Sequence, residues 1–187
     1  DHPRRKMSTL KDYGTRVAFR AAIADIAKKE VDYTEGYNNN TKYGVWFGLN
    51  HMPWCGMFVS WCYDQAARRV GCENPLMGVQ TRKGLAGVTE SYRVMAGRGW
   101  RVLPGEKLLP GDIICWDHDG KQGGPGHTGL IAVAYTAVKF QTVEGNTNTA
   151  YSRTGGSVCL HEHAFKDGNH GTLLGIIRPT RKYTNNV

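Results

Sequence analysis

The sequence predicts an α+β domain, in which N-terminal helices pack on an antiparallel C-terminal sheet of about five to six strands. Apolar residues recur at helical spacing before residue 71, whereas short β-rich segments alternate with Gly-rich turns after residue 110. The length of 187 residues suits one hydrophobic core. We therefore expect one folded domain at residues 15–180, a flexible basic tail at residues 1–14 and a C-terminal tail at residues 181–187.

Two helices are indicated first. Residues 16–31 place apolar side chains at helical spacing and predict an amphipathic helix. Residues 35–44 are rich in Asn and Gly, which is typical of a loop. Pro53 suits the first position of a second helix, which we expect to run to Val70. A glycine follows Val70 and is a common helix stop.

The rest of the chain contains short elements. A further helix is predicted at residues 89–97. The segments rich in β-branched and aromatic residues then predict a meander of strands at 112–116, 127–134, 137–144, 157–162 and 173–178.

Charge and hydropathy exclude several classes of function. The net charge of +8 favours polyanionic partners, but no basic cluster is interleaved with aromatic residues as in a nucleic-acid groove. No apolar run approaches the ~18 residues that a membrane-spanning helix requires. The first twelve residues lack the apolar stretch of a signal peptide. We expect a monomer without a membrane span or a specific nucleic-acid partner.

Cys55 is the most informative of five cysteines, whose odd number and spacing match no disulfide framework. It could be a core residue, half of a disulfide, a metal ligand or a nucleophile. A thiol at a helix start faces first-turn N–H groups that stabilise a thiolate and can hold an oxyanion. Cys62 lies about two turns further along the same helix, and Cys115 lies in an apolar strand, so both are expected in the core.

A nucleophilic cysteine needs a base, and the base needs an orienting partner. Among seven histidines, His127 follows the segment "GGPG" and opens a predicted strand, which makes it rigid and accessible. If Tyr135 and Thr136 form a two-residue turn, Glu144 lies directly opposite His127. A slip of one residue would leave both Glu144 and Asn146 near His127, so either could orient it.

Metal ligands are less well supported. Cys159, His161 and His163 would share one strand face, but three ligands on a single strand seldom converge on one zinc ion. Residues 38–54 contain no Asp or Glu, and calcium prefers carboxylate oxygens. We expect neither a metal nor another cofactor.

Four segments in order resemble the CHAP family, the cysteine, histidine-dependent amidohydrolases/peptidases. They are "PWCGMFVSWCYDQA", "LLPGDIICWD", "GHTGLIAV" and "VEGN". The resemblance extends over about residues 15–179 and is greatest to CHAP domains of phage endolysins. Position 56 is Gly where a small residue such as Ala is expected.

The resemblance implies a papain-like fold and cleavage of an amide bond in peptidoglycan. It assigns the nucleophile to Cys55, the base to His127, the orienting acid to Glu144 and a further polar role to Asn146. Trp54 and Trp116 are candidates for the wall of a substrate cleft, although packing explains them equally well.

Within that family we expect a phage endolysin without cofactor, made in the host cytoplasm and released through holin action to the wall of a Gram-positive or actinobacterial host. Anionic wall polymers are further expected partners. The alternatives are a virion-associated or bacterial wall hydrolase or toxin, and a CHAP-like module that binds the wall without cleaving it.

Overall fold

The computed structural model describes residues 6–117, 125–152, 154–165 and 170–183. Four α-helices precede five strands and a short 3-10 helix in these residues. Their bounds are α1 Tyr13–Lys29, α2 Lys42–Phe47, α3 Cys55–Val70, α4 Val88–Gly97, β1 Ile113–Asp117, β2 Gly126–Ala134, β3 Lys139–Thr147, β4 Ser157–Ala164, β5 Thr172–Ile177 and η1 Pro179–Tyr183. The predicted α+β class is therefore confirmed.

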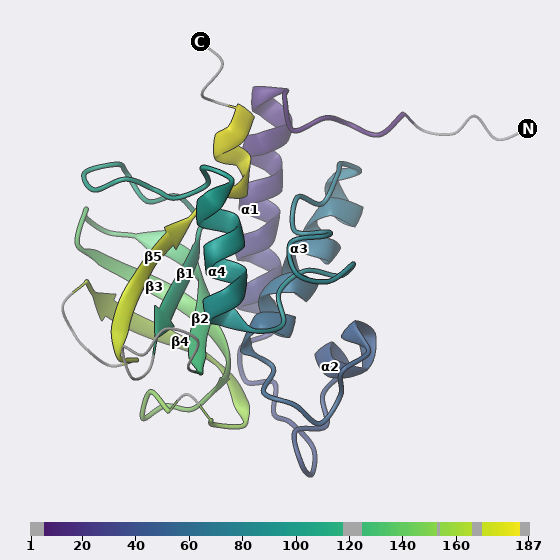
Figure 1. Ribbon diagram of the computed structural model, residues 1–187, viewed down its shortest axis with the longest axis vertical. Helices are drawn as coiled ribbons and strands as arrows, with labels where there is room; N and C mark the ends of the chain where they lie inside the picture. The colour runs from purple at the N-terminus through teal and green to yellow at the C-terminus, as the bar shows by residue number, and fades with distance from the viewer. Residues whose placement is uncertain (1–5, 118–124, 153, 166–169, 184–187) are drawn as a thin grey trace, which may run out of the picture.

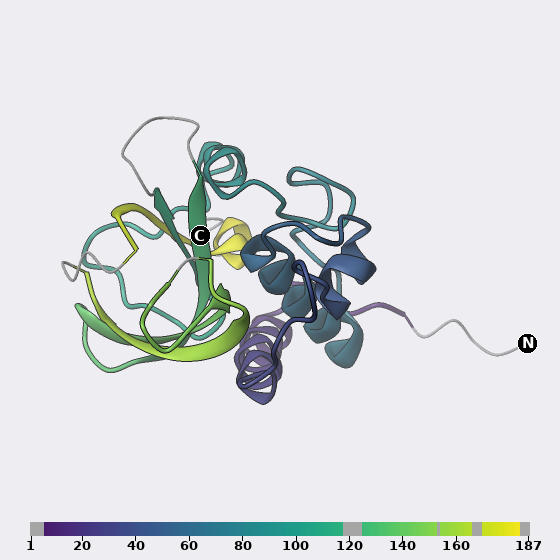
Figure 2. The same ribbon diagram turned by 90° about the horizontal axis from the view of Figure 1, so that it is seen from below.

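The five strands form one antiparallel sheet in the order β4-β3-β2-β1-β5. The first four strands follow one another as a meander, as predicted, and β5 returns to pair with β1 at the opposite edge. Helices α1 and α3 pack together and contact β2, while α4 contacts β1 and β5. Figures 1 and 2 show the curved sheet on one side of the molecule and the paired helices on the other.

The helix predictions are confirmed in substance, with local corrections. Helix α1 begins before residue 16 because the Asp12 side chain accepts a hydrogen bond from the Thr15 N–H at 2.8 Å. Helix α3 ends at Val70, and Gly71 adopts the left-handed conformation of a C-cap at φ 74°. Pro53 was expected at the first helical position, but it precedes the N-cap Trp54, so the helix begins at Cys55.

Helix α2 was not expected, because Asn and Gly dominate the segment that leads into it. The Thr41 side chain caps the helix by accepting a hydrogen bond from the Gly44 N–H at 2.8 Å. Gly48 then closes it in the left-handed conformation. The two caps thus stabilise a helix of six residues, which is too short to show apolar periodicity in the sequence.

Parts of both predicted tails contact the domain. Leu10 is buried in the core, and the Ser8 N–H donates to the Gly71 carbonyl at 2.8 Å. At the other end, the Tyr183 hydroxyl donates to a carboxylate oxygen of Glu73, and Arg181 forms an ion pair with Glu106. These contacts tie the ends of the described chain to the residues after α3 and to the loop before β1.

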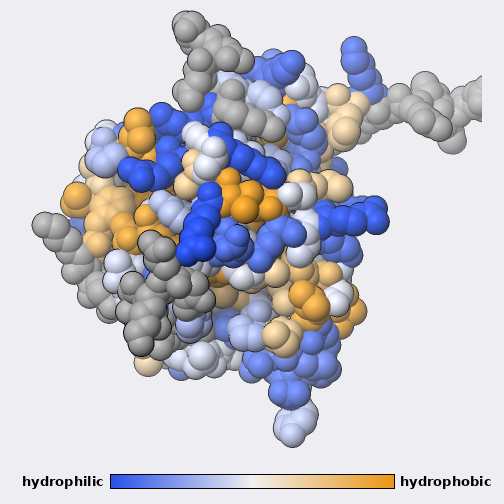
Figure 3. All heavy atoms as spheres, in the orientation of Figure 1, coloured by the Kyte–Doolittle hydropathy of each residue, from blue (hydrophilic) through white to orange (hydrophobic). Residues whose placement is uncertain are grey.

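On the face in Figure 3, hydrophilic residues predominate and apolar residues form separate patches. Among the described helices, none combines the length and the apolar character that a bilayer crossing requires.

Candidate active site

The first residue of α3 is Cys55, and its side chain is 5% exposed. The N-cap Trp54 provides no side-chain hydrogen bond to the helix start. First-turn N–H groups have no acceptor within their own helix, and the helix dipole adds partial positive charge there. The sulfur therefore lies at the end of α3 where a thiolate or an oxyanion is best stabilised.

A close approach of β3 brings this helix start to the sheet. A Cβ atom added to Gly145 would lie 2.7 Å from Cζ3 of Trp54 and 2.8 Å from Cβ of Phe58. Real Cβ contacts are longer than this, so only glycine allows the strand to lie so close to α3. The glycine of the "VEGN" segment thus sets the distance between the helix and the sheet.

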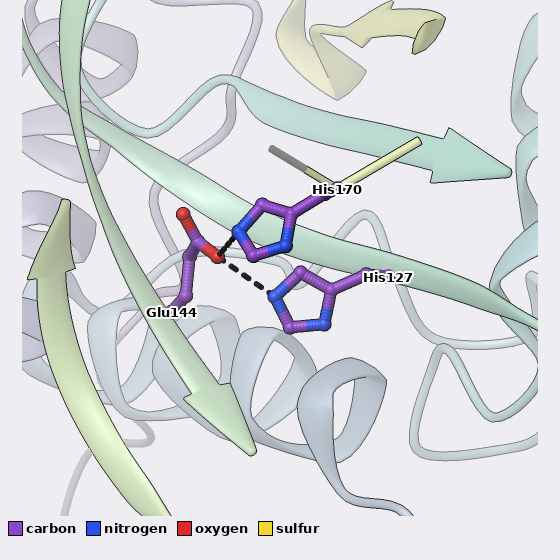
Figure 4. Close-up of side chains that lie close together, drawn as sticks. All are labelled: His127, Glu144 and His170. Carbon is purple, nitrogen blue, oxygen red and sulfur yellow. Dashed lines mark hydrogen bonds and ion pairs between the residues drawn. The ribbon is translucent and has the colours of Figure 1, made fainter. Parts of the chain in front are cut away.

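His127 and Glu144 are in direct contact across the sheet. Nε2 of His127 lies 2.7 Å from Oε1 of Glu144, and both side chains are fully buried (Figure 4). Nδ1 of the same ring makes no hydrogen bond of regular geometry with the described residues. The ring therefore holds Glu144 with one nitrogen and leaves the other for Cys55.

The electrostatics of this pair favour the imidazolium. Burial of the ring disfavours its charge, but the interactions with Cys55 and Glu144 outweigh burial and raise the pKa of His127 to about 10. Burial likewise opposes the Glu144 carboxylate. Contacts with His127 and two further histidines nevertheless hold the pKa of Glu144 well below its ordinary value.

The contact forms in a different register from the predicted one. Ala134 pairs with Phe140, not with Ala137, because the Thr136 hydroxyl accepts the N–H groups of Val138 and Lys139 in a longer turn. A bulge between Ile131 and Val133 then moves the ladder back by one residue toward the predicted register.

In the observed register, Leu130 pairs with Val143, and Glu144 lies against Gly129. A Cβ atom at Gly129 would lie 2.5 Å from Cγ of Glu144. The missing Cβ lets the Glu144 side chain cross β2 and reach His127 diagonally. The prediction that Glu144 lies directly opposite His127 is therefore wrong, although the two side chains are in contact.

The family model described as CHAP domain matches residues 47–146, more than half of the chain. The chain belongs to the CHAP domain family. The matched range contains Cys55, His127, Glu144 and Asn146. A search of curated proteins found no match.

Membership of the CHAP family implies a hydrolase of the amidase or peptidase type that acts on peptidoglycan. Four helices packed on a five-stranded antiparallel sheet agree with the papain-like architecture that the resemblance implied.

Gly56, the departure from the expected small side chain, has a local reason in this CHAP domain. A Cβ atom at this position would lie 3.1 Å from the Leu85 carbonyl oxygen and 3.2 Å from that of Ala86. An alanine would require the loop to move by a few tenths of an ångström. The glycine lets this loop pack directly against the first turn of α3.

Asn146 lies in a bulge of β3, between Glu144 and Thr147. It adopts a left-handed conformation with φ 58° and is 3% exposed. Asparagine tolerates this conformation better than most residues. Asn146 is therefore a buried residue of β3 two positions after Glu144, and a direct role in the reaction stays a prediction.

The two tryptophans occupy different surroundings. The Trp54 ring is fully buried, stacks on Tyr43 with centroids 5.4 Å apart and donates to Oε2 of Glu35 at 2.6 Å. Trp116 stacks on His127 with centroids 5.9 Å apart and is 4% exposed. In this conformation both rings pack the site from inside, and their role as cleft walls stays a prediction.

Sequence reasoning missed two histidines that reach Glu144. Nε2 of His163 lies 2.7 Å from Oε2, and Nε2 of His170 lies 2.7 Å from Oε1. The His170 contact has this short distance but not the direction of a regular hydrogen bond. The alternating residues of "CLHEH" were a signal for an inward-facing His163, whereas nothing local distinguished His170 from a turn residue.

His161, on the same face of β4, has a different partner. Its Nε2 lies 3.2 Å from the Thr147 hydroxyl oxygen, and no carboxylate contacts it among the described residues. Burial lowers the pKa of His161 to about 4, and the neighbouring His163, His170 and His127 act in the same direction, while the Glu144 charge opposes them. His161 is therefore neutral near pH 7.

One set of described side chains has the composition of a metal site. Ligand atoms of His127, Glu144 and His170 lie within 4.8 Å of one another. The zinc set considered from the sequence does not assemble as such, because His161 contacts Thr147 and His163 contacts Glu144. A metal would instead have to use the residues that form the His–Glu contacts.

The remaining cysteines differ from Cys55 in position. All five are free thiols, which excludes a disulfide within the chain. Burial raises the pKa of Cys62 well above its ordinary value and that of Cys115 to about 12. These two thiols are unreactive core residues, as predicted.

Proposed function

We propose that this CHAP domain hydrolyses an amide bond of peptidoglycan by nucleophilic catalysis, with Cys55 as nucleophile, His127 as base and Glu144 as the orienting acid. The supporting observation is that the two nitrogens of the His127 ring have different surroundings. Nε2 is fixed by Glu144 at 2.7 Å, and Nδ1 is available to the sulfur at the start of α3.

The acylation step follows from this arrangement. An imidazolium beside a thiol favours the thiolate, which attacks the amide carbonyl carbon and forms a C–S bond. First-turn N–H groups of α3 would stabilise the oxyanion. The C–N bond then breaks, and the proton on Nδ1 of His127 passes to the leaving amine nitrogen.

The second step releases the product. Neutral His127 takes a proton from water, and the hydroxide attacks the thioester carbonyl. The C–S bond breaks and the thiolate re-forms beside the imidazolium. Glu144 holds the ring in one orientation through both steps and stabilises its positive charge.

The substrate side of the proposal rests on charge as well as on the family. The net charge of +8 suits the anionic polymers of a Gram-positive or actinobacterial wall. Because the motifs also resemble CHAP domains of phage endolysins, we extend the proposal to a phage endolysin that acts at this wall during host lysis.

The catalytic claim is tested with purified walls and two cysteine variants. Cys55→Ala is expected to reduce turbidity loss at least about 10³-fold, because the nucleophile is absent. Cys159→Ala is the matched control, since Cys159 is a partly exposed thiol on β4. Equal rates for wild type and Cys55→Ala would contradict the proposal.

The bond that is cut is identified by mass spectrometry of the released muropeptides. Sugar chains whose lactyl groups carry no peptide, together with intact stem peptides, indicate an amidase. Cleaved stem or cross-bridge peptides that remain on the sugar indicate an endopeptidase. Both outcomes agree with the Cys55 mechanism. Release of sugar fragments produced by cleavage of glycosidic bonds would contradict it.

A further inference from the structure

The Glu144 carboxylate has more partners than an orienting acid needs. An ionised carboxylate offers about four acceptor positions. Oε1 contacts Nε2 of both His127 and His170, as Figure 4 shows, and Oε2 contacts Nε2 of His163 and the Thr142 hydroxyl at 2.5 Å. Three of these contacts are hydrogen bonds, and the His170 ring adds a fourth short contact, so both oxygens of the carboxylate are engaged.

Charge balance explains why such a set is required. When Cys55 is a thiolate and His127 an imidazolium, their charges cancel, and the Glu144 charge remains. Glu144 is fully buried, and a buried charge without compensating donors is strongly unfavourable. The hydrogen bonds of His163 and the Thr142 hydroxyl, together with the close His170 ring, provide that compensation.

The extra donors come from different parts of the fold. His163 lies on β4, and His170 lies directly before β5, at the two opposite edges of the sheet. Trp116 on β1 packs against both rings, with centroid separations of 5.2 Å and 4.8 Å. Both rings therefore pack against the same tryptophan that stacks on His127.

We propose that His163 and His170 are positioning residues of this hydrolase, which fix and neutralise the Glu144 carboxylate so that it can hold His127. This inference rests on the proposed function of Cys55, His127 and Glu144. It predicts that either histidine acts through Glu144 and touches no substrate.

A metal site formed by the same atoms is less well supported. Both histidine nitrogens lie 2.7 Å from a single carboxylate oxygen, which is a hydrogen-bonding distance. Zinc ligands lie about 2.0–2.2 Å from the ion and would have to exchange these contacts for it. Coordination would also remove Glu144 from its direct contact with His127.

The test compares leucine and glutamine at each position. Leucine removes the donor, whereas glutamine keeps an N–H group. His163→Leu and His170→Leu are each expected to lower kcat roughly tenfold to a hundredfold, with little change in KM. His163→Gln and His170→Gln should recover most of the rate. His161→Leu, on the same face of β4, is the matched control and should stay within about twofold.

The pH profile separates positioning from a purely structural role. The leucine variants should move the acidic limb of kcat to higher pH, because a less stabilised carboxylate takes up a proton more readily. Thermal unfolding establishes that each variant is folded. The titratable groups near the Glu144 carboxylate are His127 with Cys55 behind it, His161, His163, His170 and Cys159.

Alkylation of Cys55 by iodoacetamide, followed by peptide mapping, gives a readout that needs no substrate. Slower alkylation of Cys55 in the leucine variants is expected even if wild type fails to cleave walls, and that result would separate the two proposals. Folded leucine variants with unchanged kcat and pH profile would overturn the inference. Equal losses for leucine and glutamine, or loss of wild-type activity on treatment with EDTA, would overturn it as well.

Discussion

His127 and His161 are both buried, yet their pKa values move in opposite directions. The pKa of His127 rises to about 10, and that of His161 falls to about 4. His127 contacts the Glu144 carboxylate at 2.7 Å, whereas His161 contacts a hydroxyl at 3.2 Å. Burial alone disfavours the charged form of both rings. The comparison teaches that close polar partners, Cys55 and the Glu144 carboxylate, outweigh burial at His127, whereas burial dominates at His161.

The largest expected effect comes from removing that carboxylate charge. Glu144→Gln keeps the shape of the side chain but removes its charge, so the activity on walls should fall about 10³- to 10⁴-fold. The pKa of His127 should also fall well below 10, toward the behaviour of His161. Wall lysis rates and NMR titration of the His127 ring check both parts. A rate within tenfold of wild type would show that catalysis does not depend on the charge of the Glu144 carboxylate.

A smaller effect is expected from Gly129→Ala, which displaces Glu144 and retains its charge. The new Cβ would lie 2.5 Å from Cγ of Glu144, so the activity should fall roughly tenfold to a hundredfold. Gly97→Ala is the matched control, because a Cβ at this last residue of α4 meets no atom within 4 Å. The comparison of lysis rates separates position from charge, and equal rates for the two variants would contradict the role of Gly129.

Trp116→Phe tests how far the packing of Trp116 against His127, His163 and His170 contributes to activity. The smaller ring leaves space beside His127, His163 and His170, so a loss of activity of about threefold to tenfold and a lower melting temperature are expected. Calorimetry and lysis rates measure the two effects. A loss as large as that of Glu144→Gln would instead favour a direct role of Trp116 with substrate.

The smallest effect on activity is expected for His161→Gln, with a rate within about twofold of wild type at neutral pH. Its effect lies in the pH dependence of stability. The folded pKa of about 4 is below the ordinary value of 6.5, so the unfolded state binds a proton that the folded state does not. Stability is therefore lost as the pH falls from about 6.5 to 4.

In wild type this proton steepens the acid side of the stability curve by at most about 1.4 kcal/mol per pH unit. His161→Gln should reduce that slope, measured by urea unfolding between pH 4 and 7. The raised pKa of His127 acts in the other window, because its contribution is present below about 6.5 and is lost as the pH rises to about 10. An unchanged acid slope in His161→Gln would mean that His161 is already charged in the folded state.

The local parts of this site could be predicted from the sequence. The helix start near Cys55 follows from Pro53, and its end follows from the apolar spacing up to Val70 and the glycine after it. His127 at a strand start follows from β-rich residues behind a Gly-rich segment. Both depend on neighbours within a few residues, where periodicity and turn chemistry are informative.

The sequence by itself therefore determined the α+β class, the order of the longer elements and the candidate residues Cys55, His127 and Glu144. Only the tertiary structure decided the register of β2 and β3, because a longer turn and a bulge shift the ladder without a clear pattern in the sequence. It also decided the convergence of His163 and His170 on Glu144. Contacts between opposite sheet edges depend on the path of the whole chain, which local spacing does not specify.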